Sequence, residues 1–129
     1  DLDGFKGVND THGHHVGDKV LVAVAERILD SVRAIDLVAR YGGDEFLLVL
    51  PRTSREGGEI VAQRVRQEIN DWAVQNNIDF NVSIGIGNYP EHGCDLASVI
   101  ASVDKAMYRS KSENGRGGIL HAESVGVAS

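Results

Sequence analysis

The chain has 129 residues, of which 42% are hydrophobic and 25% are charged, and its formal net charge is −6 at pH 7. This length fits one domain with a single core, and the composition excludes a disordered or fibrous chain. The acidic balance argues against the broad basic surface of a nucleic-acid-binding protein, so we expect no nucleic acid polymer as a partner. The longest apolar run, Val20 to Ala25, is far shorter than the roughly 20 residues of a membrane-spanning helix, and we expect no direct membrane contact.

Cys94 is the single cysteine, so the chain cannot form an internal disulfide. A lone thiol is most at home in a reducing compartment, which predicts a cytoplasmic domain. The chain opens on Asp1-Leu2-Asp3, without an initiator methionine or the apolar stretch of a secretory signal. We therefore expect one domain over residues 1–129 that starts partway along a longer protein, which could itself be membrane-anchored.

The first half of the chain predicts a helix and then a hairpin. Apolar residues recur at helical spacing from Val16 to Arg33, which indicates an amphipathic helix. Leu37–Tyr41 and Glu45–Leu50 are short runs rich in β-branched, aromatic and aliphatic residues on either side of Gly42-Gly43-Asp44. This pattern is typical of a β-hairpin, and its tip carries two carboxylates.

The second half begins with another helix and a strand. Thr53 and Glu56 have the spacing of a capping box, and the helical pattern after them ends near Trp72. Residues 80–87 alternate apolar with small or polar side chains, which indicates a half-buried strand.

The last elements complete the expected order of helix, hairpin, helix, strand, helix, strand. Asp95 can cap a third helix that stops before Asn114, and Ile119 to His121 can add a short strand. The order predicts an α/β fold in which helices flank a central, mostly antiparallel sheet.

Several familiar signatures are incomplete. The chain has no P-loop, and Gly85-Ile86-Gly87 begins like a dinucleotide fingerprint but has Pro90 where the third glycine belongs. His12, His14 and His15 share one polar turn without a cysteine or carboxylate at ligand spacing, which favours surface and capping roles over metal binding.

Two acidic sites are far apart in the sequence: Asp1 and Asp3 at the start, and Asp44 and Glu45 at the hairpin tip. Carboxylates of this kind, matched with remote lysines, suit Mg²⁺ and a nucleotide triphosphate. The charged residues among 105–116 are all basic except Glu113, so we expect this segment to meet the acidic start across the fold. Turns also favour aspartate for backbone reasons, and from spacing alone that explanation is the stronger one.

The string Arg40-Tyr41-Gly42-Gly43-Asp44-Glu45-Phe46, preceded by residues 1–10 and 13–18, closely resembles the GGDEF family of diguanylate cyclases. Residues 82–87 and 104–111 resemble the family's later strand and last helix, so the resemblance spans nearly the whole chain. It implies condensation of two GTP molecules into cyclic di-GMP with release of two pyrophosphates. It also implies a homodimer for turnover and a sensory or regulatory domain attached in the parent protein.

The resemblance implies a role for each matching residue. Asp1, the backbone carbonyl of Leu2 and Asp44 would bind Mg²⁺, with Mn²⁺ as the alternative metal. Glu45 would either assist deprotonation of the attacking ribose 3′-hydroxyl or complete the metal shell, and both roles stay open. Lys6 matches a phosphate-binding lysine that takes part in catalysis.

The resemblance also assigns residues to the substrate. Asn9 and Asp18 match the family's guanine-reading pair, in which a carboxylate accepts from N–H donors that adenine lacks. Lys111 matches a second phosphate-binding lysine, and Arg116 follows it one residue later than the usual spacing. Without the resemblance, Asp18 would be a helix cap, Asn9 a turn residue and Lys111 a solvated helix-end cation.

A second site is expected just before the hairpin. Arg33-Ala34-Ile35-Asp36 lies five residues before Gly42, where many family members carry an RxxD inhibitory site for cyclic di-GMP. Arg64 falls where a second product-binding arginine is found, and arginine forks suit phosphate and guanine edges. The alternative is a helix-end Arg33 beside a surface Asp36.

The chain departs from the family at its start. The family's domain usually opens with a helix and a central strand that ends at the metal-binding aspartate, which is Asp1 here. Neither is present, so we expect a gap in the sheet and exposed apolar surface. The alternative functions are a catalytically silent module that binds GTP or cyclic di-GMP and regulates an attached domain, and a module for dimerisation alone.

Overall fold

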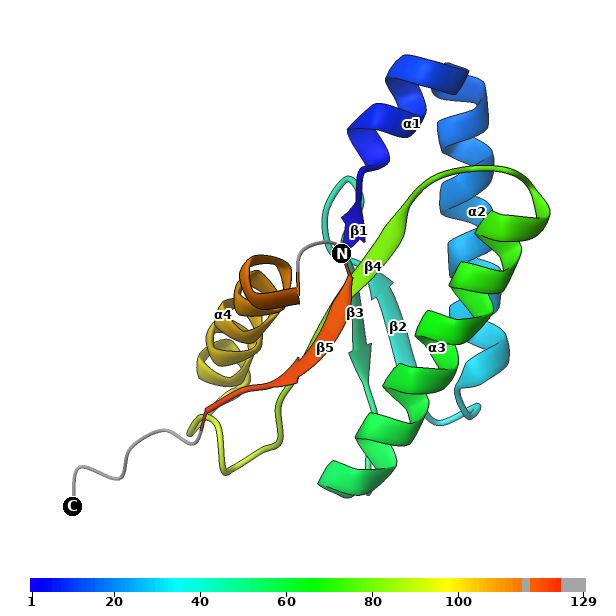
Figure 1. Ribbon diagram of the computed structural model, residues 1–129. Helices are drawn as coiled ribbons and strands as arrows, with labels where there is room; N and C mark the ends of the chain where they lie inside the picture. The colour runs from blue at the N-terminus through cyan, green and yellow to red at the C-terminus, as the bar shows by residue number, and fades with distance from the viewer. Residues whose placement is uncertain (115–116, 124–129) are drawn as a thin grey trace.

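The computed structural model describes residues 1–114 and 117–123 of the chain (Figure 1). The elements in chain order are β1 (Leu2–Asp3), α1 (Phe5–His12), α2 (His14–Ser31), β2 (Leu37–Arg40), β3 (Phe46–Val49), α3 (Arg55–Gln75), β4 (Asn81–Ile86), α4 (Leu96–Asn114) and β5 (Gly118–His121).

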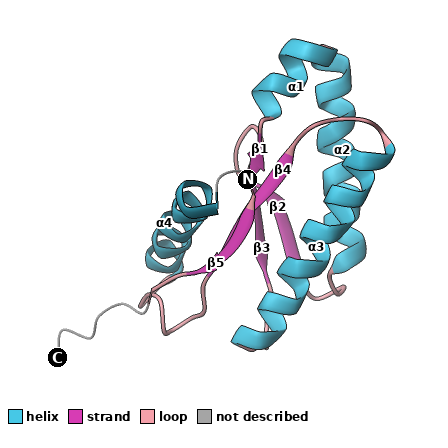
Figure 2. Cartoon of the chain, viewed as in Figure 1, coloured by secondary structure: helices cyan, strands magenta, loops and turns pink. Residues whose placement is uncertain are grey.

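The helices lie on both sides of the strands (Figure 2). Helix α3 packs against β4 and against α2, whereas α4 covers β4 and β5 from the other side. Strand β4 is the middle of a sheet ordered β1-β4-β5, and β2 and β3 form a separate hairpin. The α/β architecture with flanking helices is therefore confirmed.

The strand pairing is mixed. Strand β1 pairs antiparallel with β4, with Leu2 opposite Val82, and the hairpin is also antiparallel. Strand β5 pairs parallel with β4, with Ile119 opposite Ile84. In the described residues, β4 beyond Ser83 pairs only with β5, which agrees with the expected gap beside the short β1.

The main helices and strands lie close to their predicted positions. Helix α2 ends at Ser31, two residues before the predicted Arg33, and α3 continues three residues beyond Trp72 to Gln75. The predicted cap of α4 is confirmed, because Asp95 Oδ1 accepts a hydrogen bond from the Ser98 backbone N–H at 2.8 Å.

The predicted cap of α3 is wrong by one residue. Ser54, not Thr53, is the N-cap, and its Oγ accepts a hydrogen bond from the Gly57 backbone N–H at 3.0 Å. The Thr53 hydroxyl instead donates to the Pro51 carbonyl at 3.1 Å. Both residues are good caps, so local sequence could not choose between them.

Strand β1 and helix α1 were not predicted. Gly4 has the left-handed conformation (φ 83°) that lets the chain turn directly from β1 into α1. The short α1 contains Gly7 and Asn9, which are weak helix formers, and its one buried residue is Val8. Helix α1 is therefore stabilised by packing against α2, a contact that a search for periodicity does not detect.

The core fills the space between α2, α3 and the sheet. Its buried members are Leu2, Val8, Val20, Val24, Ile28, Val65, Ile69, Ala73, Phe80 and Val82. Val82 and the partly buried Ile84 reach this core from alternate positions of β4, as the alternation predicted. Within the described residues, none of the helices has the length and apolar character needed to cross a membrane.

Helix α4 approaches β4 so closely that Gly85 has no room for a side chain. A Cβ built on Gly85 would overlap the Val103 carbonyl oxygen and lie 2.9 Å from the Met107 backbone nitrogen. A Cβ on Gly87 would lie 2.5 Å from Val103 Cγ2. The two glycines that begin like a dinucleotide fingerprint are therefore explained by helix packing.

The Asp3 carboxylate joins three segments of the chain. Its Oδ2 accepts hydrogen bonds from Ser83 Oγ at 2.5 Å and from the Gly117 backbone N–H at 2.8 Å. The residue is only 8% exposed, so these bonds replace water that the carboxylate has lost. They tie β1 to β4 and to the residue that precedes β5.

We predict that Gly85→Ala destabilises the protein by about 1–3 kcal/mol, because the added methyl group meets backbone atoms of α4 that cannot rotate away. Urea unfolding measures the loss. Gly58→Ala in α3 is the matched control, since its Cβ would meet only Ile86 Cγ2 at 3.7 Å and alanine favours a helix. Equal stability of the two variants would contradict this account of Gly85.

We predict that Asp3→Ala destabilises the protein by about 2–4 kcal/mol, because the Ser83 hydroxyl and the Gly117 N–H lose their charged partner. Ser83→Ala should cost only about 1 kcal/mol, since the carboxylate keeps its bond to Gly117. Thermal unfolding of both variants checks the order. A smaller loss for Asp3→Ala than for Ser83→Ala would show that the carboxylate does not join these segments.

Candidate functional site

An open pocket of about 500 Å³ lies where the turn from β1 to α1, the hairpin tip and α4 meet. Its lining consists of Leu2, Asp3, Gly4, Phe5, Lys6, Asp44 and Lys111. Predicted metal-binding, phosphate-binding and catalytic residues from both ends of the chain therefore line the same pocket.

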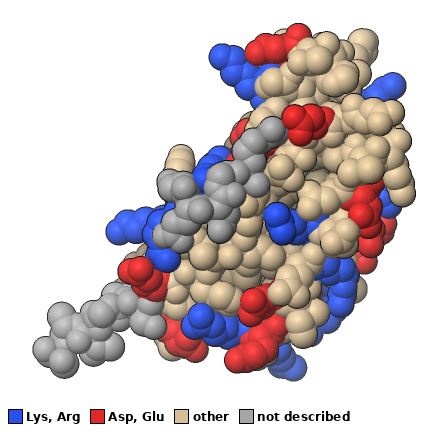
Figure 3. Space-filling model, viewed as in Figure 1, with Lys and Arg blue, Asp and Glu red and all other residues tan. Residues whose placement is uncertain are grey.

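The basic end of α4 meets the acidic start of the chain at this pocket. Lys111 Nζ pairs with the Asp1 carboxylate and lies 3.3 Å from Asp3 Oδ1. The Asp1 side chain is 8% exposed and that of Lys111 31%, so the pair is shielded on the carboxylate side. The meeting of the two ends, predicted from their charges, is confirmed for Lys111. On the face shown in Figure 3, basic and acidic side chains are otherwise interspersed.

Asp1 is held in place through its backbone. Its backbone nitrogen donates to the Ser83 carbonyl at 3.0 Å, and the Ser83 N–H donates back to the Asp1 carbonyl at 2.9 Å. This exchange of two hydrogen bonds extends the antiparallel pairing of β1 with β4. The backbone of Asp1 is therefore held on the middle strand of the sheet, and this places its carboxylate beside that strand.

An arginine that the sequence reasoning missed shapes the hairpin tip. Arg40 Nε donates to the Gly42 carbonyl at 3.2 Å, and Arg40 Nη2 donates to the Gly43 carbonyl at 2.7 Å. The Leu2 N–H donates to the Asp44 carbonyl at 3.1 Å and so ties the tip to β1. The sequence does contain an indication of this role, because an arginine stands just before a Gly-Gly turn and the backbone carbonyls of that turn need hydrogen-bond donors.

Glu45 lies beside the tip and not in the lining of the pocket. Its backbone carbonyl accepts from the Tyr41 N–H at 2.9 Å, which closes the turn. A Cβ built on Gly42 would lie 3.6 Å from Glu45 Oε2, so the carboxylate rests against the first glycine of the turn.

The donor set suits a magnesium ion that shares its shell with substrate. In the described part of the chain, no three His, Cys, Asp or Glu side chains gather into a metal-binding cluster. Of the predicted ligands, Leu2 and Asp44 line the pocket, and the Asp1 carboxylate is paired with Lys111, which lines it as well. Mg²⁺ commonly takes one or two carboxylates and completes its shell with water and phosphate oxygens, so these residues fit the ion. The Asp1 carboxylate already holds a cation, the ammonium of Lys111.

The residues expected to read guanine lie on α1 and α2. The turn between these helices is tight, because the Gly13 N–H donates to the Asn9 carbonyl at 2.9 Å and the Gly17 N–H donates to the Gly13 carbonyl at 3.1 Å. The Asn9 side chain lies directly against Gly17, the residue before Asp18. Neither Asn9 nor Asp18 belongs to the lining of the pocket, and Arg116 lies outside the described residues.

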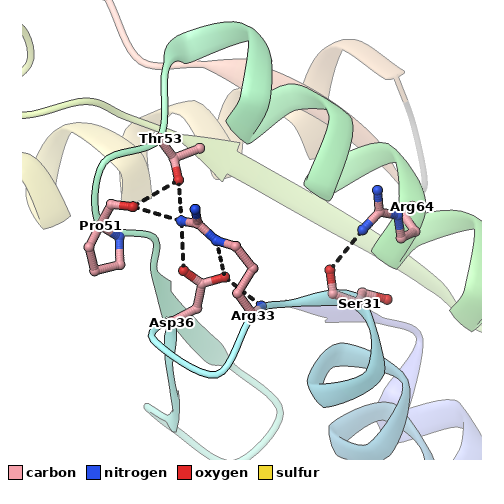
Figure 4. Close-up of polar contacts among 6 residues, drawn as sticks. All are labelled: Ser31, Arg33, Asp36, Pro51, Thr53 and Arg64. Atoms are coloured by element: carbon pink, nitrogen blue, oxygen red, sulfur yellow. Dashed lines mark hydrogen bonds and ion pairs between the residues drawn. The ribbon is translucent and has the colours of Figure 1, made fainter.

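The expected product site is built around one arginine (Figure 4). Arg33 Nη2 donates to Asp36 Oδ1 at 3.1 Å, to the Pro51 carbonyl at 2.7 Å and to Thr53 Oγ1 at 2.8 Å. The Arg33 backbone N–H also donates to Asp36 Oδ2 at 2.7 Å. Arg33 thus closes the loop after α2 and ties it to the segment before α3.

The Asp36 carboxylate is held in its charged form. Hydrogen bonds from the Arg33 side chain, and then from its backbone N–H, keep the pKa of Asp36 below its usual value. The stability that this contact contributes is therefore fully present at a pH above the usual pKa of an aspartate. It is lost only as the pH falls through the lowered pKa of Asp36.

Arg64 approaches the same loop from α3. Its Nη1 donates to the Ser31 carbonyl at 3.1 Å, at the end of α2 and two residues before Arg33 (Figure 4). The structure therefore brings the three residues expected in the product site to one end of α2. The side chain of Arg33 is 53% exposed although that of Asp36 is only 2% exposed.

The chain is similar to known proteins over nearly its whole length. Residues 1–117 match the family described as diguanylate cyclase, GGDEF domain. The bifunctional diguanylate cyclase/cyclic di-GMP phosphodiesterase MucR of Pseudomonas aeruginosa is 40% identical over 126 residues, which cover 96% of this chain and 18% of that protein. Diguanylate cyclase A of Treponema denticola is 40% identical over 119 residues, which cover 90% of this chain and 32% of that protein. The chain thus spans a third or less of these relatives.

A solved structure supports the same assignment. The GGDEF domain of DgcB from Caulobacter crescentus, crystallised in complex with c-di-GMP, has a TM-score of 0.83 and 34% sequence identity. The alignment covers 96% of this chain and 75% of that one. The family match, the relatives and the fold lead to the same conclusion, namely that the chain belongs to the GGDEF domain family.

Proposed function

We propose that this domain is an Mg²⁺-dependent diguanylate cyclase that joins two GTP molecules into cyclic di-GMP and releases two pyrophosphates. The observation that carries the proposal is the pocket in which Leu2, Lys6, Asp44 and Lys111 converge from both ends of the chain. A carboxylate and a carbonyl oxygen beside two ammonium groups suit a metal-bound triphosphate.

The reaction makes one bond and breaks one at each α-phosphate. The ribose 3′-oxygen of one GTP attacks the α-phosphorus of the other, and the bond to the pyrophosphate leaving group breaks. The proton of the 3′-hydroxyl passes to a base, for which Glu45 is a candidate beside the tip. Mg²⁺ held by Asp1, Leu2 and Asp44 would neutralise phosphate charge and lower the pKa of that hydroxyl.

The two lysines would hold the triphosphate. Lys6 is exposed at the pocket, and a Lys ammonium has three N–H donors. The ammonium of Lys111 can therefore accommodate a phosphate oxygen while it stays beside Asp1. Asn9 on α1, whose side chain lies against Gly17, and Asp18, the next residue of α2, would select guanine by its N–H donors.

Turnover would require two copies of the domain. The pocket offers one set of phosphate-binding lysines, whereas the product contains two nucleotides. Each copy would present the 3′-hydroxyl of its own GTP to the α-phosphate held by the other. The much greater length of the relatives suggests an attached regulatory domain in the parent protein that controls this encounter.

Cyclic di-GMP would inhibit the enzyme at Arg33, Asp36 and Arg64. The DgcB domain, which shares the fold, was crystallised with c-di-GMP. The side chain of Arg33 is half-exposed, and its present partners are Asp36 in the same loop and Pro51 and Thr53 in the segment before α3. A ligand phosphate or guanine edge could therefore replace the bonds to Pro51 and Thr53 without unfolding the loop.

We predict that Asp44→Ala lowers cyclic di-GMP formation from GTP and Mg²⁺ by at least about 100-fold, because it removes a metal-binding carboxylate from the pocket. Chromatography of the reaction products measures the rate. Asp30→Ala, which removes an exposed aspartate of α2, is the matched control and should leave the rate unchanged.

Two outcomes would contradict the proposal in different ways. Undiminished product formation by Asp44→Ala would remove the role given to Asp44. If the unsubstituted protein binds GTP but forms no cyclic di-GMP at any protein concentration, the domain is a silent nucleotide-binding module. A protein that binds neither GTP nor cyclic di-GMP would be a module for dimerisation alone.

We predict that added cyclic di-GMP slows the reaction and that Arg64→Ala raises the inhibition constant about tenfold, through loss of a charged hydrogen-bond donor. Arg64 donates only to a backbone carbonyl in the described contacts, so the fold should tolerate the change. Arg55→Ala, at an exposed position of the same helix, is the matched control. Equal inhibition of all three proteins would exclude Arg64 from a product site.

A further inference from the structure

Gly17 is a buried residue of α2 that lies against the side chain of Asn9. We propose that Gly17 is a positioning residue for guanine recognition, because the space left by its missing side chain is the space that the Asn9 amide occupies. This inference rests on the proposed use of GTP and on the part given there to Asn9.

The contact between the two residues leaves no room for a methyl group. A Cβ built on Gly17 would overlap Asn9 Oδ1 and lie 3.0 Å from Asn9 Cγ. The next nearest atom, Phe5 Cζ, would be 3.5 Å away, which is an ordinary van der Waals contact. The conflict is therefore with the Asn9 amide alone and not with the packing of the aromatic ring.

The backbone does not require glycine at this position. Gly4 and Gly13 have positive φ values of 83° and 88°, whereas Gly17 lies inside helix α2 and is not among the residues with positive φ. Alanine is favoured over glycine within a helix, so α2 by itself would gain from a side chain here. Lack of space beside Asn9 is what remains to account for the glycine.

A side chain at residue 17 would move Asn9 more readily than it would move the helices. The overlapping atoms are the end of a flexible side chain, which can rotate about χ1 and χ2. Their rotation would take the amide away from α2, and Asp18 is the next residue along that helix. Neither Asn9 nor Gly17 lines the pocket that holds the two lysines, so we expect triphosphate binding and the metal site to keep their geometry.

The test is calorimetric binding, with Mg²⁺ present, of guanosine 5′-(α,β-methylene)triphosphate, which cannot lose pyrophosphate. We expect Gly17→Ala to bind the analogue at least about fivefold more weakly than the unsubstituted full chain, through the misplaced hydrogen bonds of Asn9. In turnover, KM for GTP should rise while kcat changes little. Gly7→Ala is the matched control, because a Cβ on Gly7 meets nothing within 4 Å.

A double-mutant cycle separates positioning from a merely structural effect. Once Asn9→Ala has removed the amide, adding Gly17→Ala should cause no further loss of affinity, and the double variant should melt at or above the temperature of Asn9→Ala, since alanine favours the helix. This second comparison keeps the inference testable even if Gly17→Ala by itself folds poorly.

The outcomes that overturn the inference are distinct. Unchanged affinity of Gly17→Ala, or an equal loss of affinity in the presence and absence of Asn9, would show that Gly17 does not act through the amide. If the unsubstituted protein fails to bind the guanosine analogue, both this inference and the proposed function fall. Normal binding by that protein together with unchanged Gly17→Ala would overturn the inference alone.

Discussion

The arrangement of this domain depends on the contacts of one buried carboxylate, that of Asp3. One of its oxygens accepts hydrogen bonds from Ser83 on β4 and from the backbone of Gly117, and the other lies 3.3 Å from Lys111 Nζ. A buried carboxylate must be paired, and here its partners come from the middle and the end of the chain. Lys111 lies beside both Asp3 and Asp1, so the acidic and basic ends of the chain meet at one pocket.

Close backbone approaches complete the site. Gly85 lets α4 lie against β4, which brings the end of that helix toward β1, and Gly17 leaves room for Asn9 between α1 and α2. Arg40 binds the carbonyls of the Gly-Gly turn and so shapes the tip that carries Asp44. The residues around the pocket are therefore positioned by close packing at glycines and by hydrogen bonds to backbone carbonyls, in addition to the apolar core.

Much of the fold could be predicted, and the errors have physical causes. Helix α2 and β4 have clear periodicity, and the hairpin has strand-forming runs on both sides of a Gly-Gly turn, so all three lie where the pattern indicated. Helix α1 is short, contains Gly7 and depends on one buried valine, so its local signal is weak. Ser54 and not Thr53 caps α3, and the Thr53 hydroxyl instead accepts a hydrogen bond from Arg33, a residue far away in the sequence.

The sequence by itself determined the family, the helix and strand pattern and the residue types available for metal, phosphate and guanine, because motifs and periodicity are local properties. Only the tertiary structure decided which of these groups meet. In the folded chain, Lys111 forms an ion pair with Asp1, and Arg33 forms one with Asp36. The Asp3 carboxylate accepts hydrogen bonds from Ser83 and Gly117. The pairing of a buried charge depends on distances between segments that are far apart along the chain, and a linear pattern does not contain those distances.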